Sequence, residues 1–143
     1  MFVFYILIFS KHGHLIASHI PEDVSLDFQE ELLSGFFSAI QISYNFSYNT
    51  PLLSIGGKKN NRIYFFNDEA QNIIYAINCS LINHMEVQSF LKELRDIINE
   101  RFKINGDNPC YYPSDVNDEM QKILIKKAQE LEDHVKTKYF VPI

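Results

Sequence analysis

Three histidines lie close together near the start of the chain, and imidazole nitrogens are common metal ligands. His12 and His14 flank Gly13, and His19 follows in the same segment. A structural metal site also needs further ligands, such as thiolates or carboxylates, at suitable spacing. No such residue accompanies these histidines at that spacing, so we expect turn and surface histidines and no bound metal.

Other residue types that could support catalysis are also poorly placed. Cys79 ends an apolar run and Cys110 follows a proline, and neither has an electropositive neighbour in sequence that would activate a thiol. Gly56-Gly57 lacks the Gly-Lys-Ser/Thr ending of a phosphate-binding loop. A Ser/His/Asp set assembles in space, but no nucleophile-elbow motif marks one here. We therefore predict no catalytic residues, no cofactor and no enzyme activity.

Composition narrows the classes of partner and compartment. The chain has 143 residues, and its 18 acidic and 13 basic side chains give a formal net charge of -5, which argues against a dedicated nucleic-acid binder. Hydrophobic residues make up 46% of the chain, enough for a core in one domain. Two cysteines without a CxxC pair fit a reducing compartment, so we expect a cytoplasmic protein.

The apolar run Phe2–Phe9 predicts a central strand. It has no basic segment before it and no cleavage site after it, and it falls far short of the ~20 residues of a membrane-spanning helix, so we expect no anchor. Apolar residues on both sides of a strand indicate that both faces of the sheet are covered. Strict alternation would place Val3, Tyr5 and Leu7 on one face and Phe4, Ile6 and Ile8 on the other.

The remaining segments give the order β-β-α-β-β-β-α-α. Asn83 with Glu86 three residues later forms a capping box for the second helix, and Asn105-Gly106 is expected to end it. This order predicts an α+β domain over 1–143, with a core at 1–104, a linker at 105–113 and a C-terminal helix at 114–139. The expected elements are a strand at 14–20, a helix from a cap at Ser25 or Asp27, a loop at 43–49, and strands at 50–55, 62–66 and 71–79.

The first helix is apolar over more than one narrow stripe. Leu32, Phe36 and Ile42 add to a periodic set that includes Phe37 and Ile40. Either the helix is deeply buried or a second face meets a partner. Burial statistics favour the first reading. A glycine at position 35 costs about 1 kcal/mol relative to Ala in a helix, so we expect close packing against the sheet to compensate for it.

These features together resemble the longin domain, within the roadblock/longin group. The resemblance rests on the Phe2–Phe9 strand, the Gly13 turn, the helix segment Leu32-Leu33-Ser34-Gly35-Phe36-Phe37-Ser38-Ala39-Ile40 and the run from Lys58 to Phe66. It implies a three-layer α/β/α arrangement in which a five-stranded, mainly antiparallel sheet has one helix on one face and two on the other. It also implies that strands two and three form the sheet edges, and that the domain binds a longin-like domain, an extended peptide or a small GTPase.

Strand three is the edge that we expect to meet a partner. An exposed strand edge offers unpaired N–H and C=O groups, which natural proteins usually protect, and pairing with a second chain would satisfy them. We predict a dimer or partner interface on helix one and strand three, formed by Phe37, Gln41, Leu52, Leu53 and Ile55. Lys58, Lys59 and Arg62 form a basic cluster that would meet an anionic surface, against the simpler reading of a solvated hairpin tip.

We therefore expect a non-catalytic, cytoplasmic interaction module of a small-GTPase regulatory or vesicle-trafficking assembly. Its partner would be a longin- or roadblock-like domain, a small GTPase or a second copy of the chain, with no nucleic acid and at most peripheral membrane contact. The alternative is a small-molecule sensor of profilin-like topology. That alternative requires an apolar pocket, expected near Tyr44, Tyr48 and Tyr75.

Overall fold

A computed structural model describes residues 2–24, 29–56, 61–80, 83–107 and 114–139 of the chain. The order of its elements confirms the predicted β-β-α-β-β-β-α-α sequence and the α+β class. The elements are β1 (Val3–Ser10), β2 (Leu15–His19), α1 (Glu30–Tyr48), β3 (Ser54–Gly56), β4 (Arg62–Asp68), β5 (Ile73–Cys79), α2 (His84–Arg101) and α3 (Ser114–Tyr139).

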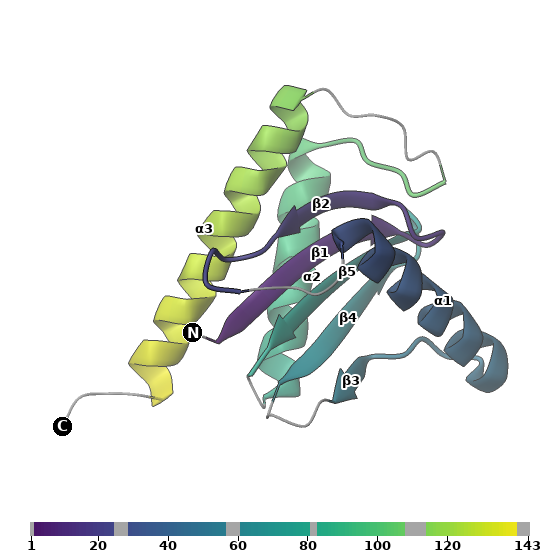
Figure 1. The fold of residues 1–143 in the computed structure, drawn as a ribbon, viewed down its shortest axis with the longest axis horizontal. Helices are drawn as coiled ribbons and strands as arrows, with labels where there is room; N and C mark the ends of the chain where they lie inside the picture. The colour runs from purple at the N-terminus through teal and green to yellow at the C-terminus, as the bar shows by residue number, and fades with distance from the viewer. Residues whose placement is uncertain (1, 25–28, 57–60, 81–82, 108–113, 140–143) are drawn as a thin grey trace.

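The five strands form one antiparallel sheet in the order β2-β1-β5-β4-β3 (Figure 1). The two most apolar strands, β1 and β5, lie at and next to the centre of the sheet, where both of their faces are covered. Strands β2 and β3 lie at the edges, as the longin resemblance implied.

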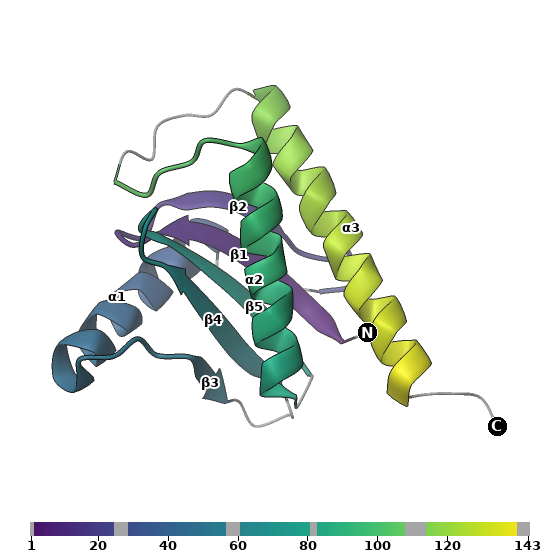
Figure 2. The same cartoon turned by 180° about the vertical axis from the view of Figure 1, so that it is seen from behind.

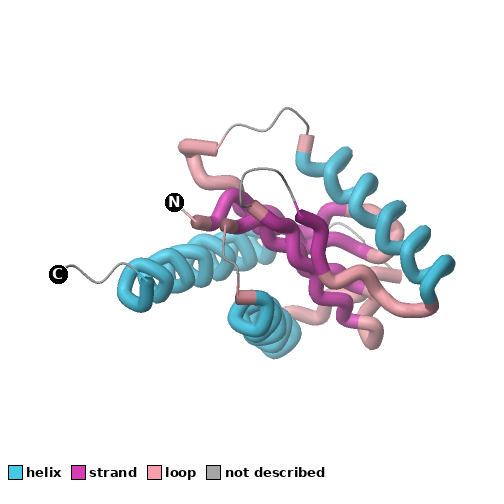
Figure 3. The backbone as a smooth tube through the Cα atoms, turned by 90° about the horizontal axis from the view of Figure 1, so that it is seen from below, coloured by secondary structure: helices cyan, strands magenta, loops and turns pink. Residues whose placement is uncertain are grey.

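Helices cover both faces of the sheet. Helix α1 lies on one face, and α2 and α3 lie together on the other (Figures 2 and 3). The larger core, between the sheet and α2 and α3, includes Ile6, Ile77, Leu91, Leu94 and Leu124. The smaller core, beneath α1, includes Leu7, Phe9, Phe37, Phe65 and Ala76. Helix α3 has the predicted bounds 114–139, and its apolar residues, among them Met120, Leu124 and Leu131, pack in the larger core.

A β-bulge at Phe4 changes the predicted faces of β1. Val3 pairs with Cys79 while Tyr5 pairs with Asn78, so Phe4 is the extra residue. Val3 consequently shares the larger core with Ile6, and Phe4 packs partly against the smaller core. The predicted placement of Val3 and Phe4 was therefore wrong, because strict alternation does not allow for an extra residue.

Helix α1 runs through the segment that was predicted as a loop at 43–49. Tyr44 and Tyr48 are one turn apart and their ring centroids lie 4.6 Å from each other, a contact that supports the last turns of the helix. The helix ends at Asn49, which adopts the left-handed conformation at φ 55° and donates its backbone N–H to the carbonyl of Asn45. The proposed caps Ser25 and Asp27 lie outside the described residues.

Helix α2 begins where the sequence predicts. The side chain of Asn83 accepts hydrogen bonds from the backbone N–H groups of Met85 and Glu86. The helix ends at Arg101, before the predicted stop at Asn105-Gly106. Met85, in the first turn of α2, is an exposed apolar residue.

Candidate interaction surface

Helix α1 has two apolar faces, and only one of them contacts the sheet. Its buried residues are Ser34, Phe37, Ser38 and Gln41. On the opposite face lie four large apolar residues, which we call the α1 stripe: Leu32 (64% exposed), Phe36 (61%), Ile42 (49%) and Phe46 (92%). The expectation that burial explains this second face was therefore wrong.

Phe37 holds α1 against the sheet. Its ring lies 5.4 Å from that of Phe65 and 6.5 Å from that of Phe9, measured between centroids, and the residue is 2% exposed. A buried side chain cannot contact a partner, so the prediction that Phe37 forms part of the interface was wrong. Phe37 packs on the sheet side of α1 and stabilises the helix that carries the α1 stripe.

The N-terminal half of α1 approaches the β1–β2 turn closely. Gly13 adopts φ +94°, and a Cβ atom there would lie 3.0 Å from the Cα of Gly35. The hydroxyl of Ser38 donates to the carbonyl of Lys11. We expected close packing to compensate for the destabilising effect of a glycine at position 35. That expectation is only partly right: α1 does pack closely at Gly35, but a Cβ atom on Gly35 itself would meet nothing within 4 Å. The tight contact needs the missing Cβ of Gly13.

Gln41 is also buried, and it binds the segment leading into β3. Its Nε2 donates to the carbonyl of Leu52 and its Oε1 accepts from the Leu52 N–H. Strand β3 itself spans only Ser54–Gly56, although a strand at 50–55 was predicted. The edge that the sequence suggested is therefore shorter, and part of it is already occupied by α1. A short edge strand is one of the ways in which proteins limit edge pairing.

The other predicted contact residues differ in exposure. Leu53 is 58% exposed, whereas Leu52 and Ile55 pack partly against the smaller core. Arg62 donates from Nη1 to the hydroxyl of Ser54 at 3.0 Å, which ties the end of β4 to the β3 edge. Lys58 and Lys59 lie outside the described residues.

The stretch that carries the α1 stripe and Leu53 contains no charged residue. Between Glu31 and Lys58 the sequence has no Asp, Glu, Lys or Arg, although charged residues make up 22% of the chain. The centres of protein interfaces are depleted in charge and enriched in aromatic residues. Hydrophobic spacing indicated a second apolar face on α1 but did not decide whether it is buried or exposed, and this uncharged stretch was the signal that favours an exposed interface.

The three tyrosines of the sensor alternative do not meet. Tyr44 and Tyr48 belong to α1 on one side of the sheet, whereas Tyr75 lies in the larger core on the other side. The predicted pocket near these residues is therefore wrong, because β5 directs Tyr75 toward α2 and α3.

The groups considered for chemistry are dispersed. Nε2 of His12 lies 4.0 Å from the Asp107 carboxylate, and both side chains are exposed. His19 is partly buried, and burial lowers its pKa. Among the described residues, no three His, Cys, Asp or Glu side chains gather closely enough to hold a metal ion. Cys79 is buried at the end of β5, and Cys110 lies outside the described residues. No helix in the described part of the chain is both long and apolar enough to cross a membrane.

Comparisons with known proteins identify the fold through structure rather than sequence. No family model matches the chain, and no curated protein sequence matches it. A solved structure of the mammalian SRP receptor is similar over 90% of this chain and 97% of that chain, with a TM-score of 0.51 and 10% identity. The gliding protein MglB from Thermus thermophilus is similar over 87% of this chain and 79% of that chain, with a TM-score of 0.49 and 6% identity.

The element order, the edge strands and the one-plus-two helix layers are those of a longin-like domain. The chain has that fold.

Proposed function

We propose that this chain is a non-catalytic interaction module in a cytoplasmic assembly that regulates a small GTPase or serves vesicle trafficking. The α1 stripe is the observation that carries the proposal. Large apolar side chains on a helix face that nothing in the described chain covers are unfavourable in water, and clusters of them mark interaction sites.

The interface would extend from the α1 stripe to Leu53. Gln41 joins α1 to Leu52, so the outer face of the helix and the exposed Leu53 are held in one fixed arrangement. Phe46 and Phe36 supply the aromatic surface that dominates the energy of many interfaces. Phe37 and Gln41 position this surface and do not contact the partner.

The kind of partner follows from the longin resemblance. Domains of this fold bind another longin-like domain or a small GTPase, and a second copy of this chain meets the same requirement. Basic residues are absent from positions 32–57, so the surface does not suit an anionic membrane, which attracts clustered Lys and Arg. Contact of Lys58, Lys59 and Arg62 with an anionic surface stays a separate prediction.

Size-exclusion chromatography with light scattering tests the proposal. The chain is run alone and mixed with small GTPases loaded with GDP or GTP. We expect a dimer, or a nucleotide-dependent complex, that the Phe46→Lys variant loses. Met85→Lys is the matched control, because Met85 is also a highly exposed apolar residue, and it lies on α2, in the layer on the other face of the sheet. A chain that stays monomeric with every GTPase would contradict the proposal.

A further inference from the structure

A groove of about 590 Å³ lies between the N-terminal half of α2 and the C-terminal half of α3. Both helices lie on the face of the sheet opposite α1, and they diverge toward this end (Figure 2). Phe90 and Leu131 line the groove as buried apolar residues, and the exposed Met85 lies at its rim. An exposed methionine is a flexible apolar contact that adapts to the partner it meets.

Two carboxylates on this groove are held by one buried ammonium group. Lys127 Nζ donates to Glu93 Oε1 and to Glu130 Oε2, each at 3.0 Å, and lies 6.0 Å from the centroid of the Phe90 ring. Lys127 is buried, whereas the side chains of Glu93 and Glu130 are 63% and 50% exposed. The groove therefore presents its carboxylates to solvent and keeps its lysine beneath them.

Each of these carboxylates keeps one oxygen for a cation from outside. Glu93 Oε2 and Glu130 Oε1 accept no hydrogen bond within the described ranges of the chain. Glu86, the third acidic residue of the groove, already pairs with Lys138. Two carboxylates against one lysine leave a net negative charge, which favours a cationic partner and opposes nucleic acid, an anionic membrane or the same groove of a second copy.

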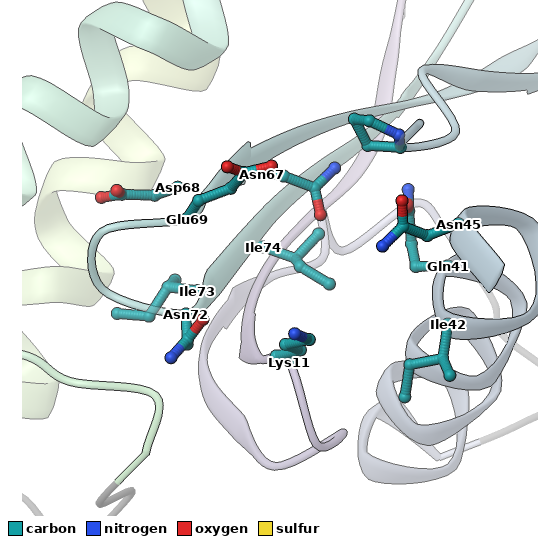
Figure 4. A pocket seen from close by; sticks show the side chains of 11 residues that line it. Lys11, Gln41, Ile42, Asn45, Asn67, Asp68, Glu69, Asn72, Ile73 and Ile74 are labelled. Atoms are coloured by element: carbon teal, nitrogen blue, oxygen red, sulfur yellow. The ribbon is translucent and has the colours of Figure 1, made fainter. Parts of the chain in front are cut away.

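A smaller hollow between α1 and the ends of β4 and β5 does not have this character. Its volume is about 210 Å³, and Lys11 lines it together with Asp68 and Glu69 (Figure 4). Charges of both signs favour no single class of partner there, so the groove between α2 and α3 is the better-defined surface.

From this arrangement we infer that the groove between α2 and α3 binds a cationic amphipathic helix of a partner protein. The apolar face of that helix rests on Phe90, Leu131 and Met85, and a Lys or Arg beside that face pairs with the two carboxylates, as in other helix-in-groove complexes. The lining of α2 from Asn83 to Glu93 spans about 15 Å at ~1.5 Å per residue, which accommodates about three helical turns. The α1 stripe lies on the opposite face of the sheet, so both surfaces can be occupied at once.

Fluorescence anisotropy of a labelled peptide with the full chain tests the inference. The probe is an amphipathic helix of leucine and arginine, about 15 residues long so that it exceeds the length of the groove. The control peptide carries glutamate at every arginine position. We expect saturable binding of the arginine peptide that weakens as NaCl is raised, because salt screens exposed charge pairs. We expect no binding of the glutamate peptide.

Matched variants separate the groove from the general negative charge of the chain. Glu93→Gln keeps an acceptor for Lys127 and should weaken binding about fivefold, as loss of one exposed charge pair implies. Glu100→Gln removes the same charge at an exposed position of α2 outside the groove and should leave binding unchanged. Met85→Lys places a positive charge at the rim and should weaken binding about tenfold, whereas Phe46→Lys, on the α1 stripe, should bind like the wild type.

Four results would overturn the inference. They are the absence of saturable binding, equal binding of the arginine and glutamate peptides, equal losses in Glu93→Gln and Glu100→Gln, and wild-type affinity in Met85→Lys. Because Met85 is exposed, the last variant is expected to fold normally and keeps the test valid if Glu93→Gln is destabilised.

Discussion

The side-chain amide of Gln41 binds both backbone polar groups of Leu52, donating to the carbonyl at 2.6 Å and accepting from the N–H at 3.1 Å. The carboxamide therefore acts as a neighbouring strand would, at the point where the chain leaves α1 and enters β3. Because Gln41 is buried on α1, this pair fixes the strand-three edge relative to the helix.

Replacing Gln41 should destabilise the fold. Gln41→Met keeps the length of the side chain but removes both hydrogen bonds, at an expected cost of about 2 kcal/mol. Urea unfolding measures this as a lower midpoint with an unchanged slope. Gln129→Met is the control, since Gln129 is exposed and its side-chain amide donates to Asp133, another exposed residue of α3. Equal midpoints for the two variants would show that the Leu52 bonds contribute little.

Two glycine substitutions should act in opposite directions. A Cβ at Gly106 would lie 1.8 Å from the carbonyl oxygen of Asn72, so Gly106→Ala should cost ~3 kcal/mol through backbone displacement. Gly35 lies within α1 and a Cβ there meets no atom within 4 Å, so Gly35→Ala should stabilise by about 0.5–1 kcal/mol. Thermal melts of both variants against the wild type give the comparison. A destabilised Gly35→Ala would contradict the geometry at the β1–β2 turn.

Tyr75 carries a buried hydroxyl at the centre of the sheet. The residue is fully buried, and its OH has no hydrogen-bond partner in the described part of the chain. Tyr75→Phe removes the unpaired group and keeps the ring, so we expect stabilisation by about 1 kcal/mol in urea unfolding. A loss of stability would show that the hydroxyl makes a favourable interaction.

Tyr5 should make stability fall in alkali. Burial raises the pKa of Tyr5 from 10.0 to about 12, against a smaller lowering effect of its hydrogen bond with Asn78. The folded state therefore keeps a proton that the unfolded state releases above pH 10. Its contribution is fully present below pH 10 and is lost as the pH rises toward 12, by up to about 2 kcal/mol.

Unfolding in urea at pH 8, 10 and 11 measures this pH dependence. Tyr5→Phe should flatten the decline but not abolish it, because burial also raises the pKa of Tyr75. An identical decline in the variant would exclude Tyr5 as a cause.

The sequence predicts most of the fold because local signals agree with the tertiary structure. Asn83 caps α2 as expected, since the capping pattern is local. The Phe4 bulge was missed because it depends on pairing with β5, which follows much later in the chain. The Gln41–Leu52 pair was missed for a related reason: a glutamine that replaces a strand neighbour has no signature in spacing. The same periodicity marks both faces of α1, so it could not tell the buried Phe37 from the exposed Phe36.

The most direct test of the α1 stripe is light scattering of the wild type, Phe46→Lys, Leu53→Lys and Met85→Lys over a range of concentrations, alone and with GTPases. We expect a dimer or complex for the wild type and Met85→Lys. We expect monomers for Phe46→Lys and Leu53→Lys, with unchanged circular dichroism. Association that persists when Phe46 is charged, or that Met85→Lys alone abolishes, would show that the α1 stripe is not the interface.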